Sequence, residues 1–152
     1  MTIVQPLDEI SRAIIAELQQ DGRRPYAVIG KAVGLSETAV RQRVHRLLES
    51  GAVQVVAVTD PARIGLNRQA LIGVRSDGDV QAVADHLAAI PEVAYVVITA
   101  GTFDLLAEVV CEDDEQLLAI LNDRIRSLPE VTATETFVYL RIRKQAPTYH
   151  RG

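Results

Sequence analysis

The sequence has little of what marks a secreted, disulfide-rich or membrane protein. Cys111 is the only cysteine among 152 residues, so no disulfide can form within the chain and a reducing compartment is expected. No apolar run approaches the roughly 18 residues that a membrane span needs. The opening MTIVQPLDEI has no basic stretch followed by an apolar core, so we expect no secretory signal and a cytoplasmic location.

Features that would indicate catalysis or metal binding are also scarce. Aromatic residues make up 4% of the chain and Trp is absent, which disfavours a stacking platform for single-stranded nucleic acid. His45, His86 and His150 show no metal-ligand spacing. The acidic run at 111–116 is more typical of a helix N-terminus than of a metal site. We therefore predict no catalytic residues, no metal and no cofactor.

Positive charge is present but concentrated in one region. The chain has a formal net charge of −4. Residues 23–46, however, contain six Lys/Arg and only one acid, Glu37. A local basic surface can attract a polyanion even when the whole molecule is acidic, so a nucleic-acid partner is compatible with this composition.

Three helices are predicted in the first part, over 7–20, 25–33 and 36–50. Apolar residues recur at helical spacing, with Ile10, Ile14 and Leu18 on one face of the first helix. Gly34 separates the second and third helices, and Ser36 suits the N-cap of the third. A short glycine turn between two helices is typical of a helix-turn-helix. The β-branched stretch at 52–60 predicts a strand or wing.

The second part alternates between strand and helix patterns. We predict strands at 68–75, 93–100, 105–111 and 131–143, and helices at 79–90 and 114–128. The order βαββαβ indicates a ferredoxin-like domain. The chain is thus predicted to be α+β, with an N-terminal (winged) helix-turn-helix domain at 1–60, a hinge at 61–67, the ferredoxin-like domain at 68–144 and a tail at 145–152.

The third helix has the pattern of a DNA-recognition helix. An apolar stripe of Val40, Val44, Leu47 and Leu48 would pack on the other two helices. A solvated polar face is the competing interpretation. Against it, the only acids, Glu37 and Glu49, stand at the helix ends, so the basic face is expected to lack acidic i,i+4 partners. The predicted DNA-binding residues are Ser36, Thr38, Arg41, Gln42, Arg43, His45 and Arg46.

The chain resembles the Lrp/AsnC (feast/famine) family of bacterial and archaeal transcription regulators. The resemblance rests on LDEISRAIIAELQQDGRRPYAVIGKAVGLSETAVRQRVHRLLESGAV in the first half, and on TAGTFDLLAEV and LPEVTATETFVYL in the second. It covers nearly the whole chain. One departure is Arg24-Pro25, where the family more often has a small or polar residue before the second helix.

The resemblance implies a sequence-specific regulator that binds double-stranded operator DNA in the cytoplasm, associated with the nucleoid. The second domain would be the family's regulator (RAM) domain, which forms dimers through its sheet and often an octamer, a tetramer of dimers. It would bind a small effector, usually an amino acid, where dimers meet. The residues that resemble the effector site are Thr99, Ala100, Gly101, Thr102, Asp104, Thr134 and Thr136.

The residues alone leave other interpretations open. Gly101 permits close backbone approach or a positive φ, and Asp104 could accept an ammonium group, but a plain hairpin turn explains both. A ferredoxin-like ligand-binding protein whose helix-turn-helix contacts other proteins is one alternative. An enzyme of amino-acid metabolism using Asp104 and Glu108 is another, and the lack of a clear acid/base pair disfavours it.

Overall fold

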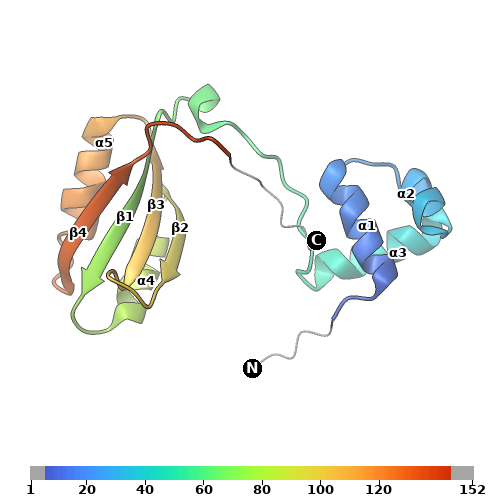
Figure 1. The fold of residues 1–152 in the computed structure, drawn as a ribbon, viewed down its shortest axis with the longest axis horizontal. Coiled ribbons are helices and arrows are strands. Elements are labelled where there is room, and N and C mark those ends of the chain that lie inside the picture. Colours follow the sequence, from blue (N-terminus) through green and yellow to red (C-terminus); the bar gives the residue numbers. More distant parts are fainter. Residues whose placement is uncertain (1–5, 145–152) are drawn as a thin grey trace. The chain divides into compact units, whose positions relative to one another are not determined.

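The computed structural model describes residues 6–144, which divide into two compact units (Figure 1). The first unit extends to Val58 and the second begins at Thr59. The tail expected at 145–152 lies outside the described residues. No helix among the described residues is long and apolar enough to cross a membrane.

Three helices form the first unit: α1 (Glu9–Gln20), α2 (Tyr26–Val33) and α3 (Glu37–Glu49). Side chains cap two of them, because Asp8 Oδ1 accepts the Ser11 N–H at 2.7 Å and Ser36 Oγ accepts the Ala39 N–H at 3.2 Å. Gly34 ends α2 with a φ of 73°. The predicted helix-turn-helix is confirmed, with α2 beginning directly after Pro25.

The helices share a small apolar core made of Ile14, Leu18, Ile29, Val40 and Val44. Two side chains predicted to be buried are instead exposed: Ile10 at 36% and Leu48 at 41%. Both lie in end turns, Ile10 in the first turn of α1 and Leu48 in the last turn of α3, where the shared interior stops. Helical periodicity predicts which face of a helix is buried. It does not predict where along the helix the neighbouring elements stop covering that face.

Close packing at Gly30 holds the turn between α2 and α3. A Cβ atom at this position would lie 2.5 Å from the backbone oxygen of Leu35. The Leu35 N–H also donates to the Gly30 carbonyl at 2.9 Å. The turn residues therefore lie directly against the helix, and only glycine leaves room for them.

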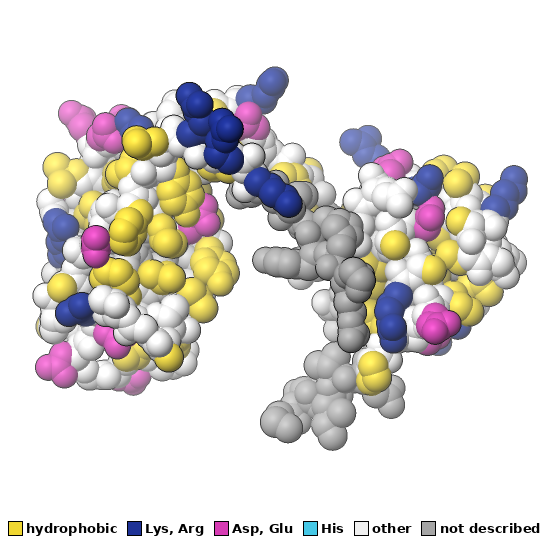
Figure 2. Space-filling model, viewed as in Figure 1, with side chains coloured by type: hydrophobic (Ala, Val, Ile, Leu, Met, Phe, Trp, Pro, Cys, Tyr) yellow, Lys and Arg dark blue, Asp and Glu magenta, His cyan; other side chains and the backbone are white. Residues whose placement is uncertain are grey.

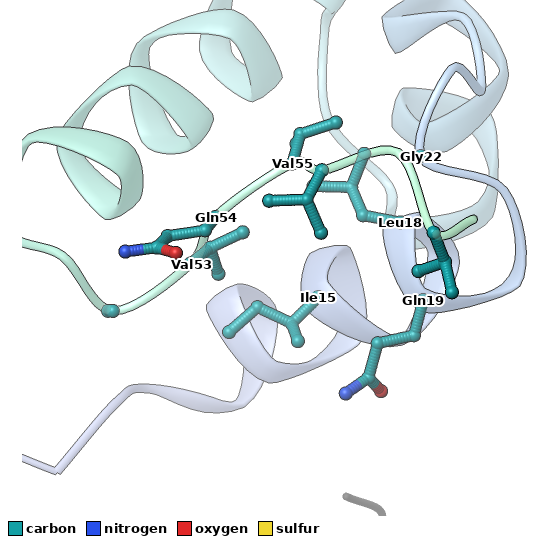
Figure 3. A pocket seen from close by; sticks show the side chains of 10 residues that line it. Ile15, Leu18, Gln19, Gly22, Val53, Gln54 and Val55 are labelled. Carbon is teal, nitrogen blue, oxygen red and sulfur yellow. The ribbon is translucent and has the colours of Figure 1, made fainter. Parts of the chain in front are cut away.

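The segment after α3 contains no strand, and the prediction of a strand or wing at 52–60 was wrong. The chain passes along α1 instead, and Val53 and Val55 line an apolar cavity of about 480 Å³ together with Ile15 and Leu18 (Figure 3). A β-strand needs a neighbouring strand for its hydrogen bonds, and the described residues of the first unit include none. β-Branched composition alone does not supply that partner.

The second unit is an α/β sandwich of two layers. Its sheet has the order β2-β3-β1-β4, all antiparallel, with β1 (Arg68–Ser76), β2 (Val93–Ile98), β3 (Leu105–Cys111) and β4 (Val131–Val138). Helices α4 (Val80–Ala88) and α5 (Asp114–Ala119) pack on one face over alternate strand residues such as Ile72, Val74 and Ala107. The predicted ferredoxin-like βαββαβ order is confirmed.

No helix or strand among residues 6–144 covers the other face of the sheet (Figure 1). Strand alternation places Leu71, Leu106 and Phe137 on it, and Tyr95 and Phe137 are 54% and 44% exposed. Figure 2 shows hydrophobic side chains gathered over this face. The same register places Glu108 and Glu135 on this face, but its exposed hydrophobic side chains indicate an interface with another molecule.

Several element boundaries differ from prediction. β4 stops at Val138 rather than 143; in its register with β1, Leu140 already lies opposite Arg68, the first residue of β1, so residues 141–143 have no β1 partner. The helix expected at 114–128 ends as α5 and continues as a π-helical turn, η2 (Ile120–Ile125). The hinge expected at 61–67 contains a short 3₁₀ helix, η1 (Pro61–Ile64), capped by Asp60.

Candidate nucleic-acid interface and ligand loop

The exposed face of α3 presents Thr38, Gln42, His45 and Arg46 to solvent. Within residues 6–144, the side chains of Thr38, Gln42 and Arg46 have no hydrogen-bond or ion-pair partner. His45 contacts Glu49, with Nδ1 3.1 Å from a carboxylate oxygen. Buried Val40, Val44 and Leu47 fix the opposite face of the helix. The helix therefore holds a set of unengaged donors and acceptors pointing away from the unit.

Arg41 lies on the flank of this face and has two partners. Its Nη2 atom is 2.7 Å from Glu37 Oε1, and its guanidinium carbon is 5.2 Å from the centroid of the Tyr26 ring. The expectation that the basic face lacks acidic i,i+4 partners was therefore wrong, since Glu37 and Glu49 both act as such partners. Exposed pairs of this kind are weak, so they orient Arg41 and His45 while leaving both available to a stronger anion.

Arg43 points inward, toward the start of α1. Its Nη1 atom lies 2.7 Å from Asp8 Oδ2 and 3.2 Å from Ser11 Oγ. The Arg43 hydrogen bond, helped by Ser11, holds the pKa of Asp8 well below its usual range. This partner lies 35 positions away, and no local pattern in the sequence points to it. The contact ties the third helix to the first, so in this structure Arg43 positions α3.

The segment resembling an effector loop, Thr99–Asp104, joins β2 to β3 as a well-ordered hairpin. The Thr99 N–H donates to the Asp104 carbonyl at 2.9 Å, and Thr99 Oγ1 donates to the Phe103 carbonyl at 2.5 Å. The loop is also fastened to β1, because the Ser76 N–H donates to Asp104 Oδ2 at 2.8 Å and Arg75 Nε to the Thr102 carbonyl at 3.0 Å. One carboxylate oxygen of Asp104 is thus engaged in the hydrogen bond that holds the loop against β1.

Phe103 lies on the uncovered face of the sheet and was missed by sequence reasoning. A Cβ atom at Gly73 would come within 2.6 Å of its ring, so the ring rests directly on the β1 backbone. It meets Phe137 edge-on, with centroids 6.4 Å apart, and the Arg75 guanidinium lies 6.0 Å from its centroid. The loop is therefore packed against the same apolar surface that lacks a cover.

Gly101 lies at the tip of the loop. Of the two uses expected of this glycine, a positive φ is not observed. A Cβ atom there would meet nothing within 4 Å, and the neighbouring Ala100 and Thr102 are exposed. Open space beside a backbone without a side chain leaves room for a ligand to approach the peptide groups.

Thr134 and Thr136 lie on the helix-covered face of β4, opposite Val74 and Ile72. Thr134 Oγ1 accepts a hydrogen bond from Arg126 Nε at 2.8 Å, whereas Thr136 Oγ1 is buried without a partner. Phe103, by contrast, lies on the uncovered face of the sheet. In the contacts described above, the loop tip and the two threonines therefore do not line a common cavity.

Groups suited to metal binding are absent from the described residues, where no three His, Cys, Asp or Glu side chains come together. Cys111 is buried, and burial raises the pKa of its thiol. It therefore packs as a small apolar residue.

Comparison with known families matches both units. The AsnC-type helix-turn-helix domain matches residues 7–48, and a C-terminal dimeric α+β barrel domain of AsnC-type regulators matches residues 66–149. The HTH-type transcriptional regulator FL11 of Pyrococcus horikoshii is 37% identical over 92% of this chain and 93% of its own length.

Two solved structures share the whole architecture. The leucine response regulatory protein LrpA of Mycobacterium tuberculosis is 28% identical, with a TM-score of 0.83 over 94% of this chain and 99% of its own. The transcriptional regulator NMB0573 of Neisseria meningitidis, solved as a complex with L-Met, has a TM-score of 0.85 over 95% and 97%. At 24% identity, the latter likeness shows the fold alone.

Proposed function

This chain belongs to the Lrp/AsnC family of transcriptional regulators, and on that premise we propose that it binds specific double-stranded operator sequences under the control of an amino-acid effector. It is a transcriptional regulator with a helix-turn-helix domain and an AsnC-type regulatory domain, and not an enzyme. Because its target is DNA, we place its activity in the cytoplasm, at the nucleoid.

The observation that carries the proposal is the unengaged polar face of α3. Gln side chains pair with adenine and Arg side chains with guanine at base edges in the major groove, and Thr contacts either base edges or the thymine methyl group. Thr38, Gln42 and Arg46 are the three exposed side chains without partners, and they are assigned to base reading. Exposed Arg41 and His45 are assigned to phosphates, and Arg43 to positioning.

Ser36 and the start of α3 supply a further contact with the DNA backbone. The Ser36 side chain caps the helix through Ala39, which leaves other first-turn N–H groups directed outward. Backbone N–H groups at a helix N-terminus bind phosphate well. Backbone contacts of this kind set the register of a recognition helix without reading sequence.

Self-association follows from the second unit. The matching domain is described as dimeric, and the uncovered sheet face bears Leu71, Leu106 and Phe137. We assign this face to the dimer contact and expect further assembly toward a tetramer of dimers. Paired recognition helices predict a roughly palindromic operator, with half-sites spaced by whole turns of DNA.

The effector is proposed to bind at the tip of the Thr99–Asp104 loop. One relative by structure is a leucine response regulatory protein and another was solved with L-Met, which supports an amino acid as the ligand class. The open space at Gly101 would admit the carboxylate to backbone N–H groups, and the second oxygen of Asp104 would accept the ammonium group. An effector that favours one assembly shifts DNA affinity by its differential binding.

Selection of genomic fragments on the immobilised protein, followed by footprinting, tests this proposal. We expect enrichment of fragments with paired half-sites and a footprint altered by at least one amino acid from a complete panel. Fragments enriched without any shared sequence would contradict specific binding. A footprint that responds to none of the amino acids would contradict the proposed effector class while leaving operator binding intact.

A further inference from the structure

The positive charge of the second unit is gathered at one end. Residues 59–144 contain eight Lys/Arg and fourteen Asp/Glu. Five of the eight cations fall within two short segments, 59–68 and 139–144, which contain only one of the fourteen acids, Asp60. A random scatter of charges over an acidic domain would not separate the two signs in this way.

The fold brings the two segments together. The Tyr139 N–H donates to the Gln69 carbonyl at 2.9 Å, which places the chain after β4 beside the start of β1. Ala62 of η1 and Arg141 line the same shallow cavity of about 220 Å³. Figure 2 shows Lys and Arg side chains gathered over η1 and the chain that follows β4.

Two of the five cations are engaged and three are not. Arg68 pairs with Asp114, its Nη2 3.0 Å from Oδ2, and Arg63 lies 3.7 Å from Asp60 but is 85% exposed. Arg141, Arg143 and Lys144 are exposed and have no ion-pair partner within residues 6–144. We call Arg63, Arg141, Arg143 and Lys144 the junction patch, because they lie at the end of the second unit where it follows the first in sequence.

The chemistry of the junction patch suits an extended polyanion rather than a small ligand. Its cavity is below the roughly 300–1,000 Å³ of typical ligand pockets, and although Tyr139 lines it, no described aromatic ring stacks on a cation there. Four exposed cations on a run of chain match the closely spaced phosphates of duplex DNA, which carries a charge about every 1.7 Å of helix axis. An operator held by α3 would also raise the local concentration of phosphates around the rest of the chain.

We infer that the junction patch binds the phosphate backbone of duplex DNA, as a second, sequence-independent contact of the regulator. This inference rests on the proposed function, since DNA bound at α3 is the polyanion that the patch meets. The contact would add affinity and salt dependence while leaving base discrimination to Gln42 and Arg46.

The test compares salt dependence across variants of the full chain. Anisotropy of a labelled duplex of mixed sequence, and of a selected operator, would be titrated at several salt concentrations. R141A/R143A/K144A should reduce the slope of log Kobs against log[salt] by about 3 per protomer, since each lost phosphate contact removes about 0.9. R141K/R143K should keep the wild-type slope because phosphate binding needs only the charge.

Two controls separate the junction patch from general charge and from the recognition helix. R143A should lower the slope, whereas R124A, an exposed arginine of the same unit outside the patch, should not. Q42A/R46A should lose the preference for operator over mixed duplex, which the triple variant should retain. An unchanged slope in the triple variant, or a slope reduced as much in R124A as in R143A, would overturn this inference and leave the proposed function standing. A wild type that binds no duplex would overturn it together with the proposed function.

Discussion

The Nη1 atom of Arg43 on the recognition helix lies 2.7 Å from Oδ2 of Asp8, the residue that caps α1. Asp8 thereby serves two elements, since its other oxygen accepts the Ser11 N–H at 2.7 Å. One carboxylate starts the first helix and anchors the third. The orientation of α3 thus depends on a residue that precedes α1.

Replacing Asp8 should therefore lower the stability of the first unit in a graded way. Asp8→Ala removes the cap and the ion pair, whereas Asp8→Asn keeps a capping oxygen and loses only the charge. Thermal unfolding should give a melting temperature that decreases from wild type to Asp8→Asn to Asp8→Ala. Equal melting temperatures for the two variants would show that the cap contributes nothing beyond the pair with Arg43.

Lowering the pH should erase the advantage of wild type over Asp8→Asn. The pKa of Asp8 is depressed in the folded chain, so its stabilisation is complete above the ordinary value of about 4 and declines as pH falls below it. The gap in melting temperature should be constant from neutral pH to about 5 and narrow below 4. A gap that stays constant to the lowest accessible pH would contradict the ion pair.

Gly30→Ala should disrupt the turn that presents α3. The new Cβ atom would lie 2.5 Å from the Leu35 backbone oxygen, and backbone cannot move aside as a flexible side chain can. A loss of at least about 1 kcal/mol in the free energy of unfolding is expected from overpacking. Chemical denaturation measures it, with Gly22→Ala as the control, because its Cβ would come no closer than 3.4 Å to a Val55 methyl group and 3.9 Å to the Leu18 backbone oxygen.

Gly73→Ala should displace Phe103 from the sheet. Its Cβ would lie 2.6 Å from the ring, and we expect a cost of about 1–3 kcal/mol. In the background of Phe103→Ala the same substitution should cost much less, because the clashing ring is gone. Denaturant unfolding of all four proteins gives the coupling. Additive losses would mean that the ring does not rest on Gly73.

Gly101→Ala should separate folding from effector response. Open space surrounds this position and its φ is not positive, so stability should be unchanged or rise by up to about 1 kcal/mol. The added methyl group should weaken the response to amino acids if a ligand approaches the loop backbone. Unfolding curves and footprints with the amino-acid panel would be compared, and a full response in the variant would contradict the proposed loop site.

The sequence predicted elements well where the required signal was local. The helix around Val40, Val44 and Leu47 and the strand at 105–111 were both recognisable from periodicity, and Ser36 from its capping position. The prediction of a strand at 52–60 was wrong because a strand forms only beside a neighbouring strand, and composition does not reveal whether one is present. The end of β4 at Val138 was likewise set by where β1 begins.

In the candidate site too, local features could be predicted from the sequence and long-range contacts could not. Exposure of Gln42 and Arg46 follows from the helical wheel, so these residues could be named from the sequence. Arg43 pairs with Asp8, which lies 35 positions away in the sequence, and the Phe103 ring packs on Gly73, which lies 30 positions away. Both contacts depend on tertiary packing. Sequence reasoning therefore listed Arg43 among DNA contacts, whereas its guanidinium is engaged within the unit.

Operator binding by Q42A/R46A, compared with wild type and R124A, tests the central claim most directly. Anisotropy would be measured on a selected operator at fixed salt, with circular dichroism confirming that all three proteins are folded. Each lost base contact should cost about 1–3 kcal/mol, so the double variant should bind at least about 30-fold more weakly while R124A binds as wild type. Equal affinity of all three proteins would contradict the assignment of α3 as the recognition helix.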